Sequence, residues 1–369
     1  MSQYNLSDYD YELPEELIAQ YPTEARGTSR LLVLERKTGT LVDTKFVNLR
    51  EHIPARALLV ANNSRVAPAR LNGRRANGAK VELLLLTTPP LLQEYAIVAN
   101  GWQRAEATVL LKPGKSIKVG DWLEFCSEDS DDRYCIRVEI LYKQDFGRHS
   151  VNIYWQGDLP ICLDHIGNIP LPPYIKRTQE DVDQERYQTV YSRKDKAGSV
   201  AAPTAGLHFT EELRRLIKKE FDWAEVTLHV GYGTFSPVRE DDIRRHSMHR
   251  EFVEVPAETV QAVLQARRDG RPVVAVGTTT ARTLEGMISE GVPADASING
   301  WSGWTDIFIY SGYEFKVVNA MLTNFHLPKS SLLMLVSALA GRETVLAAYR
   351  HAIMKKYNFF SYGDAMLIV

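Results

Sequence analysis

The chain has 369 residues, which exceeds the usual size of one domain and predicts about two domains with room for a sizeable core. Its formal net charge of −2 excludes a globally basic nucleic-acid-binding protein, so any contact with phosphates must come from local basic patches. No apolar run reaches membrane-spanning length, and we expect a soluble, cytoplasmic protein without membrane contact.

The three cysteines, Cys126, Cys135 and Cys162, show neither CxxC spacing nor a histidine-paired metal spacing. We therefore expect a reducing compartment and no metal site. Cys126 and Cys135 flank an acidic turn and can face each other across a hairpin, but we expect both to pack as reduced side chains.

The first part of the chain, up to Asn62, predicts the edge of an α/β unit. A short helix is expected over Pro14–Gln20, followed by strands over Leu31–Leu34 and Leu58–Ala61. Beyond Pro68 the pattern changes to short alternating or apolar runs separated by turns, without a helical period, which is typical of a small β-barrel or sandwich. The expected strands are Lys80–Thr87, Tyr95–Ala99, Ala107–Leu111, Asp121–Phe125, Tyr134–Tyr142 and Ser150–Trp155.

After Pro170 helices and strands alternate again, which indicates that the α/β unit resumes. The expected helices are Glu211–Glu220, Ala257–Asp269, Ala281–Ile288 and Arg342–Lys356, and the expected strands are Ala224–Val230, Pro272–Val276, Asp306–Ile309 and Ala365–Val369. The economical description is a discontinuous α/β domain, residues 1–64 and 160–369, into which a small β domain, residues 65–159, is inserted.

The segment GSVAAPTAGLHFT, residues 198–210, combines a stiffening proline, a flexible glycine and one titratable side chain, His208. Thr204 is one of its few other polar residues, and Gly206 allows close backbone approach. Such a loop suits a ligand site, although an ordinary loop into a helix capped by Thr210 explains the same residues.

Two further stretches place glycine or threonine at strand ends. HVGYGTFSPV follows a strand with Gly231, Gly233 and Thr234, which can let backbone N–H groups approach a ligand or form a plain turn. PVVAVGTTTARTLEG runs from a strand into a helix and predicts an anion site at the helix N-terminus, unless the threonines only cap the helix. It lacks the P-loop lysine, so nucleoside triphosphate hydrolysis is not expected.

The C-terminal third places polar residues beside an apolar helix and a terminal strand. LTNFHLP contributes Asn324 and His326, and SYGD contributes Asp364 at the mouth of the strand, where a carboxylate is suited to acid or base chemistry or only begins the strand. His249, in HSMHREFVEV, belongs to a loop that enters a strand and can equally be solvated surface.

Basic residues gather next to these stretches, and together they predict a face that follows RNA phosphates if they converge in space. The candidates are Arg65, Arg70, Arg74, Arg75, Arg193, Lys194 and Lys196.

The motifs GSVAAPTAGLHFT, VGYGTF, GTTTARTLE, LTNFHLP and SYGDAM, in this order, resemble those of the S-adenosylmethionine:tRNA ribosyltransferase-isomerases of queuosine synthesis. The resemblance extends over nearly the whole chain through SRLL, SRVAPARL, IPLPPYI and RYQTVY. It implies a bacterial α/β enzyme with an inserted β-barrel, which moves the ribosyl part of S-adenosylmethionine onto 7-aminomethyl-7-deazaguanine in a tRNA anticodon. The products are epoxyqueuosine, adenine and methionine. The partners implied are this tRNA and S-adenosylmethionine, a co-substrate; no cofactor is required, and we expect a monomer.

The implied reaction requires a base, an acid and a site for a sulfonium cation. His208, His326 and Asp364 are the candidates for proton transfer. The candidates for binding substrate are Thr204, Gly206, Gly231, Gly233, Thr234, His249, Gly277, Thr278, Thr279, Arg282, Glu285, Asn324, Ser361, Tyr362 and Gly363. The chain departs from the family pattern at Asn358, where arginine is usual, but it retains every residue nominated for chemistry.

Two other kinds of protein compete with this interpretation. An S-adenosylmethionine-dependent RNA methyltransferase would need a strand followed by a glycine-rich turn near the start of the α/β domain, which the sequence lacks. A non-catalytic RNA-binding module is disfavoured because RNP-type aromatic motifs are absent.

Overall fold

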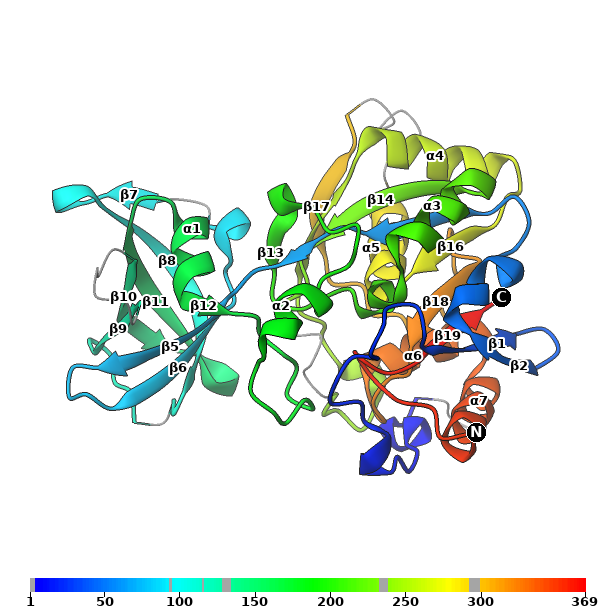
Figure 1. Ribbon diagram of the computed structural model, residues 1–369, viewed down its shortest axis with the longest axis horizontal. Coiled ribbons are helices and arrows are strands. Elements are labelled where there is room, and N and C mark those ends of the chain that lie inside the picture. The colour runs from blue at the N-terminus through cyan, green and yellow to red at the C-terminus, as the bar shows by residue number, and fades with distance from the viewer. Residues whose placement is uncertain (1–3, 93–94, 115, 128–133, 232–237, 292–298) are drawn as a thin grey trace.

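The computed structural model describes residues 4–92, 95–114, 116–127, 134–231, 238–291 and 299–369, and it contains two bodies of different architecture (Figure 1). The larger body is built on a nine-stranded sheet in the order β17-β15-β14-β3-β16-β18-β19-β1-β2. Its strands are β1 Arg30–Glu35, β2 Thr40–Lys45, β3 Leu58–Asn62, β14 Asp222–Leu228, β15 Glu251–Val255, β16 Val273–Val276, β17 Trp301–Thr305, β18 Ala320–Asn324 and β19 Ala365–Ile368.

The centre of this sheet is parallel, with β14, β3, β16 and β18 running in one direction. These strands are buried on both faces, which explains why β3 and β16 read as continuous apolar runs. In β3, Leu58 and Val60 pack on one face and Leu59 and Ala61 on the other.

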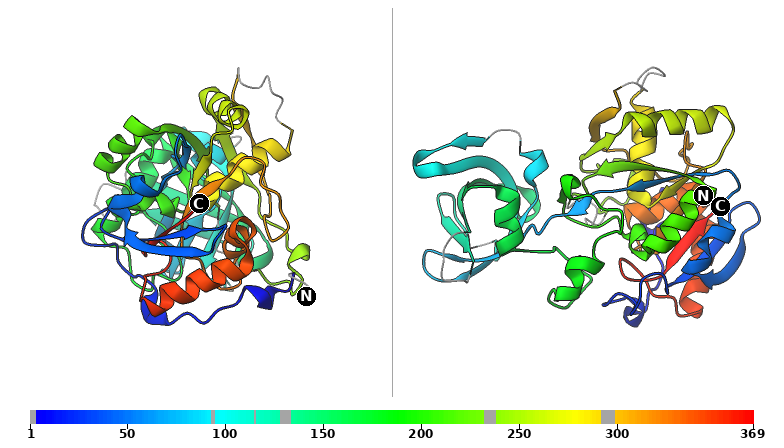
Figure 2. Two further views of the ribbon diagram at one scale, coloured as in Figure 1. Left: turned by 90° about the vertical axis from the view of Figure 1, so that its right-hand side faces the viewer. Right: turned by 45° about the horizontal axis from the view of Figure 1, so that its top comes forward.

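Helices cover both faces of the sheet (Figures 1 and 2). One face carries α4 Ala257–Arg268, α5 Thr278–Ser289, α6 Ser331–Ala340 and α7 Arg342–Met354, and the other carries α3 Glu211–Glu220 and the 3-10 helix Phe46–His52. Among the described residues no single helix is long and apolar enough to span a membrane, although α6 and α7 taken together across a 113° bend meet that test by length and composition.

The smaller body is a closed barrel of six strands, because β11 pairs with both β10 and β8. The strands are β5 Arg70–Arg75, β6 Lys80–Leu85, β8 Trp102–Lys112, β9 Trp122–Cys126, β10 Cys135–Lys143 and β11 Arg148–Gln156, with β7 Tyr95–Ile97 added on β8. The expectation of an α/β fold with an inserted β-barrel is therefore confirmed. Alternate residues such as Leu83 and Val109 fill the barrel.

Short elements connect the two bodies. On the way into the barrel the chain forms β4 Arg65–Val66, which pairs in parallel with β13 Ala197–Ser199 on the way out. Helix α1 Leu159–Ile166 packs in the barrel core, β12 Gly167–Asn168 pairs with β5, and α2 Asp181–Arg186 follows. The exact domain boundaries, predicted at residues 64/65 and 159/160, stay a prediction.

The remaining short elements are 3-10 helices at Leu6–Tyr9, Glu15–Leu17, Pro89–Leu91, Ala99–Gly101, Asp145–Gly147, Lys194–Lys196, Thr204–His208 and Ile243–Arg245.

Three expectations were wrong. The helix predicted at Pro14–Gln20 is only a 3-10 turn, Glu15–Leu17, because the N–H groups of Leu17 and Ile18 donate to carbonyls three residues back, those of Pro14 and Glu15. The strand predicted at Asp306–Ile309 is absent, since β17 ends at Thr305 and the Ile307 carbonyl accepts a hydrogen bond from Arg282 Nε at 3.3 Å. Cys126 and Cys135 form a disulfide rather than packing as thiols, because the hairpin holds their Cα atoms 4.1 Å apart in direct register.

Candidate active site

A cavity opens where the central strands of the large sheet end. Residues that follow β14, β16 and β18 line it, as expected for a parallel sheet that binds ligands beyond the carboxyl ends of its strands. Seven predicted site residues contribute to its wall, namely Thr204, Gly277, Thr278, Thr279, Asn324, His326 and Ser361.

The N-terminus of α5 faces this cavity. Gly277 has a φ of 91°, a conformation that glycine adopts without strain, and it turns the chain from β16 into the helix. Thr278 and Thr279 then present hydroxyls and the first N–H groups of the helix, which lack partners within the helix itself. The arrangement is suited to an anionic group.

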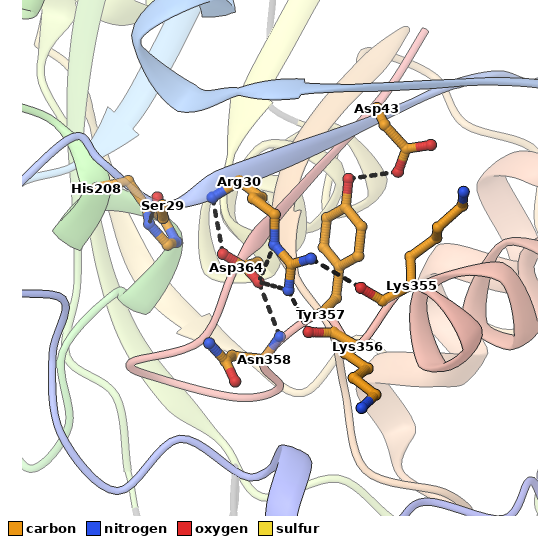
Figure 3. Close-up of polar contacts among 9 residues, drawn as sticks. All are labelled: Ser29, Arg30, Asp43, His208, Lys355, Lys356, Tyr357, Asn358 and Asp364. Carbon is orange, nitrogen blue, oxygen red and sulfur yellow. Dashed lines mark hydrogen bonds and ion pairs between the residues drawn. The ribbon is translucent and has the colours of Figure 1, made fainter.

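Asn324 and His208 form a fixed polar pair beside the cavity. Asn324 Nδ2 donates to the Phe360 carbonyl at 3.1 Å and to His208 Nε2 at 3.1 Å, and its Oδ1 accepts from the Thr204 hydroxyl at 2.9 Å. Because Nδ2 can only donate, His208 Nε2 is the acceptor and carries no proton. The proton of the neutral ring is therefore on Nδ1, which contacts Ser29 Oγ at 2.8 Å (Figure 3).

Burial, with a smaller contribution from the positive charge of Arg26, lowers the pKa of His208 to about 4. The imidazole is consequently neutral at neutral pH. Both ring nitrogens already contact protein groups, so in this arrangement His208 orients Asn324 rather than offering a free nitrogen to a ligand.

His326, in contrast, lines the cavity directly. Its Nε2 contacts the Thr323 hydroxyl at 2.8 Å, and its backbone N–H donates to the Tyr349 hydroxyl at 3.0 Å. Burial lowers the pKa of His326 to about 3, so this ring is also neutral at neutral pH. It is the titratable candidate with direct access to a bound ligand.

Asp364 lies outside the cavity wall and is held by Arg30 (Figure 3). Its carboxylate accepts hydrogen bonds from the Arg30 backbone N–H at 2.7 Å, from Arg30 Nε and Nη2 at 3.2 and 3.0 Å, and from the Asn358 N–H at 2.8 Å. Arg30 also donates to the carbonyls of Lys355 and Lys356 and stacks on the Tyr357 ring. The carboxylate therefore ties the SYGD loop to the start of β1.

Known proteins resemble this chain over its whole length. The sequence pattern described as queuosine biosynthesis protein matches residues 6–368. The chain is 56% identical over 374 aligned residues to the S-adenosylmethionine:tRNA ribosyltransferase-isomerase of Nitratidesulfovibrio vulgaris strain DP4, with 100% of this chain and 98% of the relative covered.

The chain belongs to the queuosine biosynthesis protein family.

Two other members are similar to it. The S-adenosylmethionine:tRNA ribosyltransferase-isomerase of Oleidesulfovibrio alaskensis is 53% identical, with 99% of this chain and 93% of the relative covered. The crystal structure of S-adenosylmethionine tRNA ribosyltransferase from Thermotoga maritima is 36% identical, with a TM-score of 0.52, and covers 98% of this chain and 100% of that protein.

The residues of the SYGD motif have different surroundings. Ser361 lines the cavity and contacts the Tyr174 hydroxyl at 2.6 Å. Tyr362 points elsewhere, and its hydroxyl donates to Asp183 at 2.7 Å. Gly363 is required by packing, because a Cβ there would lie 2.4 Å from the Asn358 carbonyl oxygen.

Several predicted substrate residues lie away from the cavity wall. Gly206 packs against Tyr191, whose hydroxyl would lie 2.0 Å from an added Cβ. Arg282 forms a buried ion pair with Glu251, and Glu251 Oε1 accepts from the Gly231 N–H at 3.0 Å. These contacts join α5, β15 and the glycine turn after β14.

Glu285 is fully buried and anchors a loop. It accepts backbone N–H groups from Lys316, Val317 and Val318 at 2.8 to 2.9 Å and the Tyr313 hydroxyl at 2.9 Å. His249 is exposed and outside the cavity wall. Gly233 and Thr234 lie outside the described residues.

The predicted basic residues separate into two groups. Arg65 and the segment Arg193–Lys196 meet where β4 pairs with β13, whereas Arg70, Arg74 and Arg75 follow β5 into the barrel. Arg75, Arg193 and Lys196 make ion pairs with Asp121, Asp195 and Glu254. Arg65, Arg70 and Arg74 donate only to hydroxyl or carbonyl oxygens in the part of the chain that the structure describes.

Sequence reasoning missed Ser29, Arg30, Arg26 and Tyr174 as parts of the site. Ser29 and Arg30 begin the SRLL motif and Tyr174 lies in IPLPPYI, so the resemblance marked both stretches without assigning them chemistry. Across the described ranges no cluster of three His, Cys, Asp or Glu side chains is arranged to hold a metal ion.

Proposed function

We propose that this chain transfers the ribosyl moiety of S-adenosylmethionine to tRNA and isomerises it, as the names of its relatives state for those proteins. The observation that carries the proposal is 56% identity across the whole chain to an S-adenosylmethionine:tRNA ribosyltransferase-isomerase. The acceptor is 7-aminomethyl-7-deazaguanine in the anticodon, and the products are epoxyqueuosine, adenine and methionine. S-adenosylmethionine acts as a co-substrate, and no cofactor takes part.

In this proposal the cavity at the ends of the central strands holds the donor. The N-terminus of α5, with Thr278 and Thr279, receives the carboxylate of the methionine part, because unpaired N–H groups and the helix dipole favour a negative charge. Thr204 and Asn324, which are hydrogen-bonded to each other at 2.9 Å, present fixed polar groups to the ribose.

His326 is our proposed proton acceptor. The Thr323 hydroxyl lies within 3.3 Å of the Asn324 carbonyl, and when it donates there, Nε2–H of His326 donates to Thr323. Nδ1 then carries a lone pair that can take the acidified proton next to the sulfonium. His208 and Asp364 act as positioning residues, since their polar atoms are already engaged by Ser29, Asn324, Arg30 and Asn358.

The test is to incubate the protein with S-adenosylmethionine and tRNA carrying the aminomethyl base. Adenine and methionine are expected in equal amounts, and the tRNA gains the mass of the modified ribosyl group. A methyltransferase would instead produce S-adenosylhomocysteine, and a binding module would leave S-adenosylmethionine intact. Either of these results, obtained with folded protein, contradicts the proposed function.

A further inference from the structure

A second, smaller cavity lies next to the donor cavity, and Ser361 lines both. His208 forms part of its wall, together with Leu207 and Gly363. Two arginines, Arg26 and Arg186, also line it. The enclosed part of this pocket is smaller than that of the donor cavity, so it has no room for an adenosyl group.

The guanidinium groups of both arginines bind neutral carbonyl oxygens. Arg26 donates to the carbonyls of Glu185, Gln188 and Leu207 at 2.8, 2.9 and 3.1 Å. Arg186 Nη1 donates to the Glu24 carbonyl at 3.3 Å, and its Nε is buried without a hydrogen-bond partner among the described residues. Carbonyl oxygens fix the side chains in place but do not neutralise their charges.

Among the described residues neither arginine donates to a carboxylate, although the Glu185 carboxylate acts on Arg26 from a distance. Asp183, the buried acid of the same region, is already engaged by Arg177 at 2.7 and 2.8 Å and by the Tyr362 hydroxyl. Burial lowers the pKa of Arg26, repulsion from Arg186 lowers it further and attraction to Glu185 opposes the change, which indicates that the two positive charges act on each other. Two guanidinium groups that line one pocket, neither hydrogen-bonded to a carboxylate among the described residues, make an electrostatic site for an anion.

We propose that Arg26 and Arg186 bind a phosphate group of the RNA next to the modified nucleotide. Planar guanidinium groups match phosphate oxygens and form two parallel hydrogen bonds with them. This position fixes the RNA backbone beside His208 and Ser361, so that the acceptor base is directed toward the donor cavity. The inference rests on the proposed function, which supplies the RNA.

The source of the anion is RNA rather than the methionine carboxylate of the donor. The donor cavity already provides the N-terminus of α5 for that carboxylate, whereas the residues of α5 do not line the small cavity, which shares only Ser361 with the donor cavity among the described residues. If the anion is an RNA phosphate, losing an arginine raises the KM for tRNA. If it is the donor carboxylate, the same loss raises the KM for S-adenosylmethionine.

The test compares Arg186→Gln with Arg186→Lys and with Arg215→Gln, a control on an exposed arginine of α3. Arg186 is chosen because it makes one long hydrogen bond, whereas Arg26 makes three and stabilises the loop. In Arg186→Gln we expect the KM for tRNA to rise about tenfold with the KM for S-adenosylmethionine unchanged. The slope of log Kd for tRNA against log salt should fall by about 1. In Arg186→Lys the KM for tRNA should rise about threefold, and the slope of log Kd against log salt should stay unchanged because the charge is kept.

An unchanged KM for tRNA and an unchanged salt slope in Arg186→Gln overturn the proposal. So does a raised KM for S-adenosylmethionine alone, because the anion would then be the donor carboxylate. Direct tRNA binding without S-adenosylmethionine separates this result from a failure of the proposed reaction. If Arg186→Gln does not fold, as judged by circular dichroism, Arg186→Lys decides through its KM for tRNA.

Discussion

At the scale of single residues, the site contains two histidines whose burial disfavours the protonated imidazole. His208 and His326 are both buried and neutral at neutral pH, with pKa values of about 4 and about 3. In the unfolded chain a histidine binds a proton below about pH 6.5. Acid therefore favours the unfolded chain, which binds more protons than the folded protein between these pH values.

The first prediction concerns this pH dependence. Because the folded-state pKa of His208 lies below its unfolded value, its stabilising contribution is complete above about pH 6.5 and is lost as the pH falls toward 4. We expect the Tm to fall between pH 7 and pH 5, with His208 accounting for up to about 3 kcal/mol of the full acid loss. In His208→Gln, which keeps a polar amide, the fall in Tm should be smaller. Identical slopes of Tm against pH for the two proteins contradict this prediction.

The second prediction distinguishes a structural Asp364 from a proton-transferring one. Asp364→Asn leaves Arg30 without its charge partner and removes one acceptor from the SYGD loop. Because the Arg30 side chain is 37% exposed, solvent screens part of the loss, and we expect the free energy of unfolding to fall by about 1 to 2 kcal/mol. Urea unfolding measures it, with the exposed Asp164→Asn as control. If stability is unchanged and kcat falls strongly, Asp364 takes part in proton transfer instead.

At the scale of elements, α5 joins the cavity to the framework of the sheet. Its first residues face the cavity, and its buried Arg282 and Glu285 bind β15 and the loop before β18. The predicted substrate residues of this helix thus separate by position, with the first turn at the cavity and the next turns in the core.

Substituting Gly277 tests the first turn. Gly277→Ala forces a side chain into a backbone with φ of 91°, although the added Cβ meets only ordinary contacts at 3.6 and 3.7 Å. We expect a loss of about 1 to 3 kcal/mol in stability and a raised KM for S-adenosylmethionine, because the strained turn moves the helix N-terminus. Gly270→Ala, with φ of 62° and open space around it, should lose stability without any change in KM. Equal KM values in both variants contradict a donor site at this turn.

Substituting Glu285 tests the core of the same helix. Glu285→Gln removes the charge that accepts three backbone N–H groups, and its amide nitrogen cannot accept any of them. We expect the free energy of unfolding to fall by about 2 to 3 kcal/mol, measured by urea denaturation, with the KM for S-adenosylmethionine unchanged. If the KM rises at unchanged stability, Glu285 contacts substrate as the sequence analysis predicted.

The sequence predicted helices well where apolar residues recurred at helical spacing over a long segment. The helix expected at Glu211–Glu220 is α3 with the same ends, because Thr210 caps it and Leu213 and Ile217 repeat on one face. Of the stretches with glycine or threonine at a strand end, the one that begins at Gly277 lines the cavity, and its role in binding stays a prediction. The partners of Asp364 and Glu285 could not be predicted from the sequence. Arg30 is 334 positions from Asp364. Glu285 binds backbone N–H groups, which are the same for every residue type except proline.

At the scale of the whole molecule, the basic residues along β5 and at the junction of β4 with β13 differ in whether a carboxylate already pairs with them. Arg65, Arg70 and Arg74 keep positive charges without ion pairs among the described residues, whereas Arg75 and Arg193 are paired. Unpaired cations release more counterions on binding RNA than cations that must first break an ion pair.

This difference predicts the salt response. Raising salt from about 50 to about 200 mM should weaken tRNA binding about tenfold or more. Arg74→Gln should reduce the slope of log Kd against log salt by about 1, whereas Arg193→Gln, which also frees Asp195, should reduce it less. Fluorescence anisotropy with labelled tRNA measures both slopes. A flat salt response removes the proposed phosphate contacts.

The position of β19 also constrains how the protein can be made on the ribosome. This strand lies between β18 and β1, so residues 365–368 complete a sheet whose first strand is residues 30–35. During elongation the hairpin of β1 and β2 can pair only with itself until those late residues leave the exit tunnel. The barrel, whose closing strands are all made by residue 156, can fold long before that, so the nascent chain carries a finished barrel beside an open sheet edge.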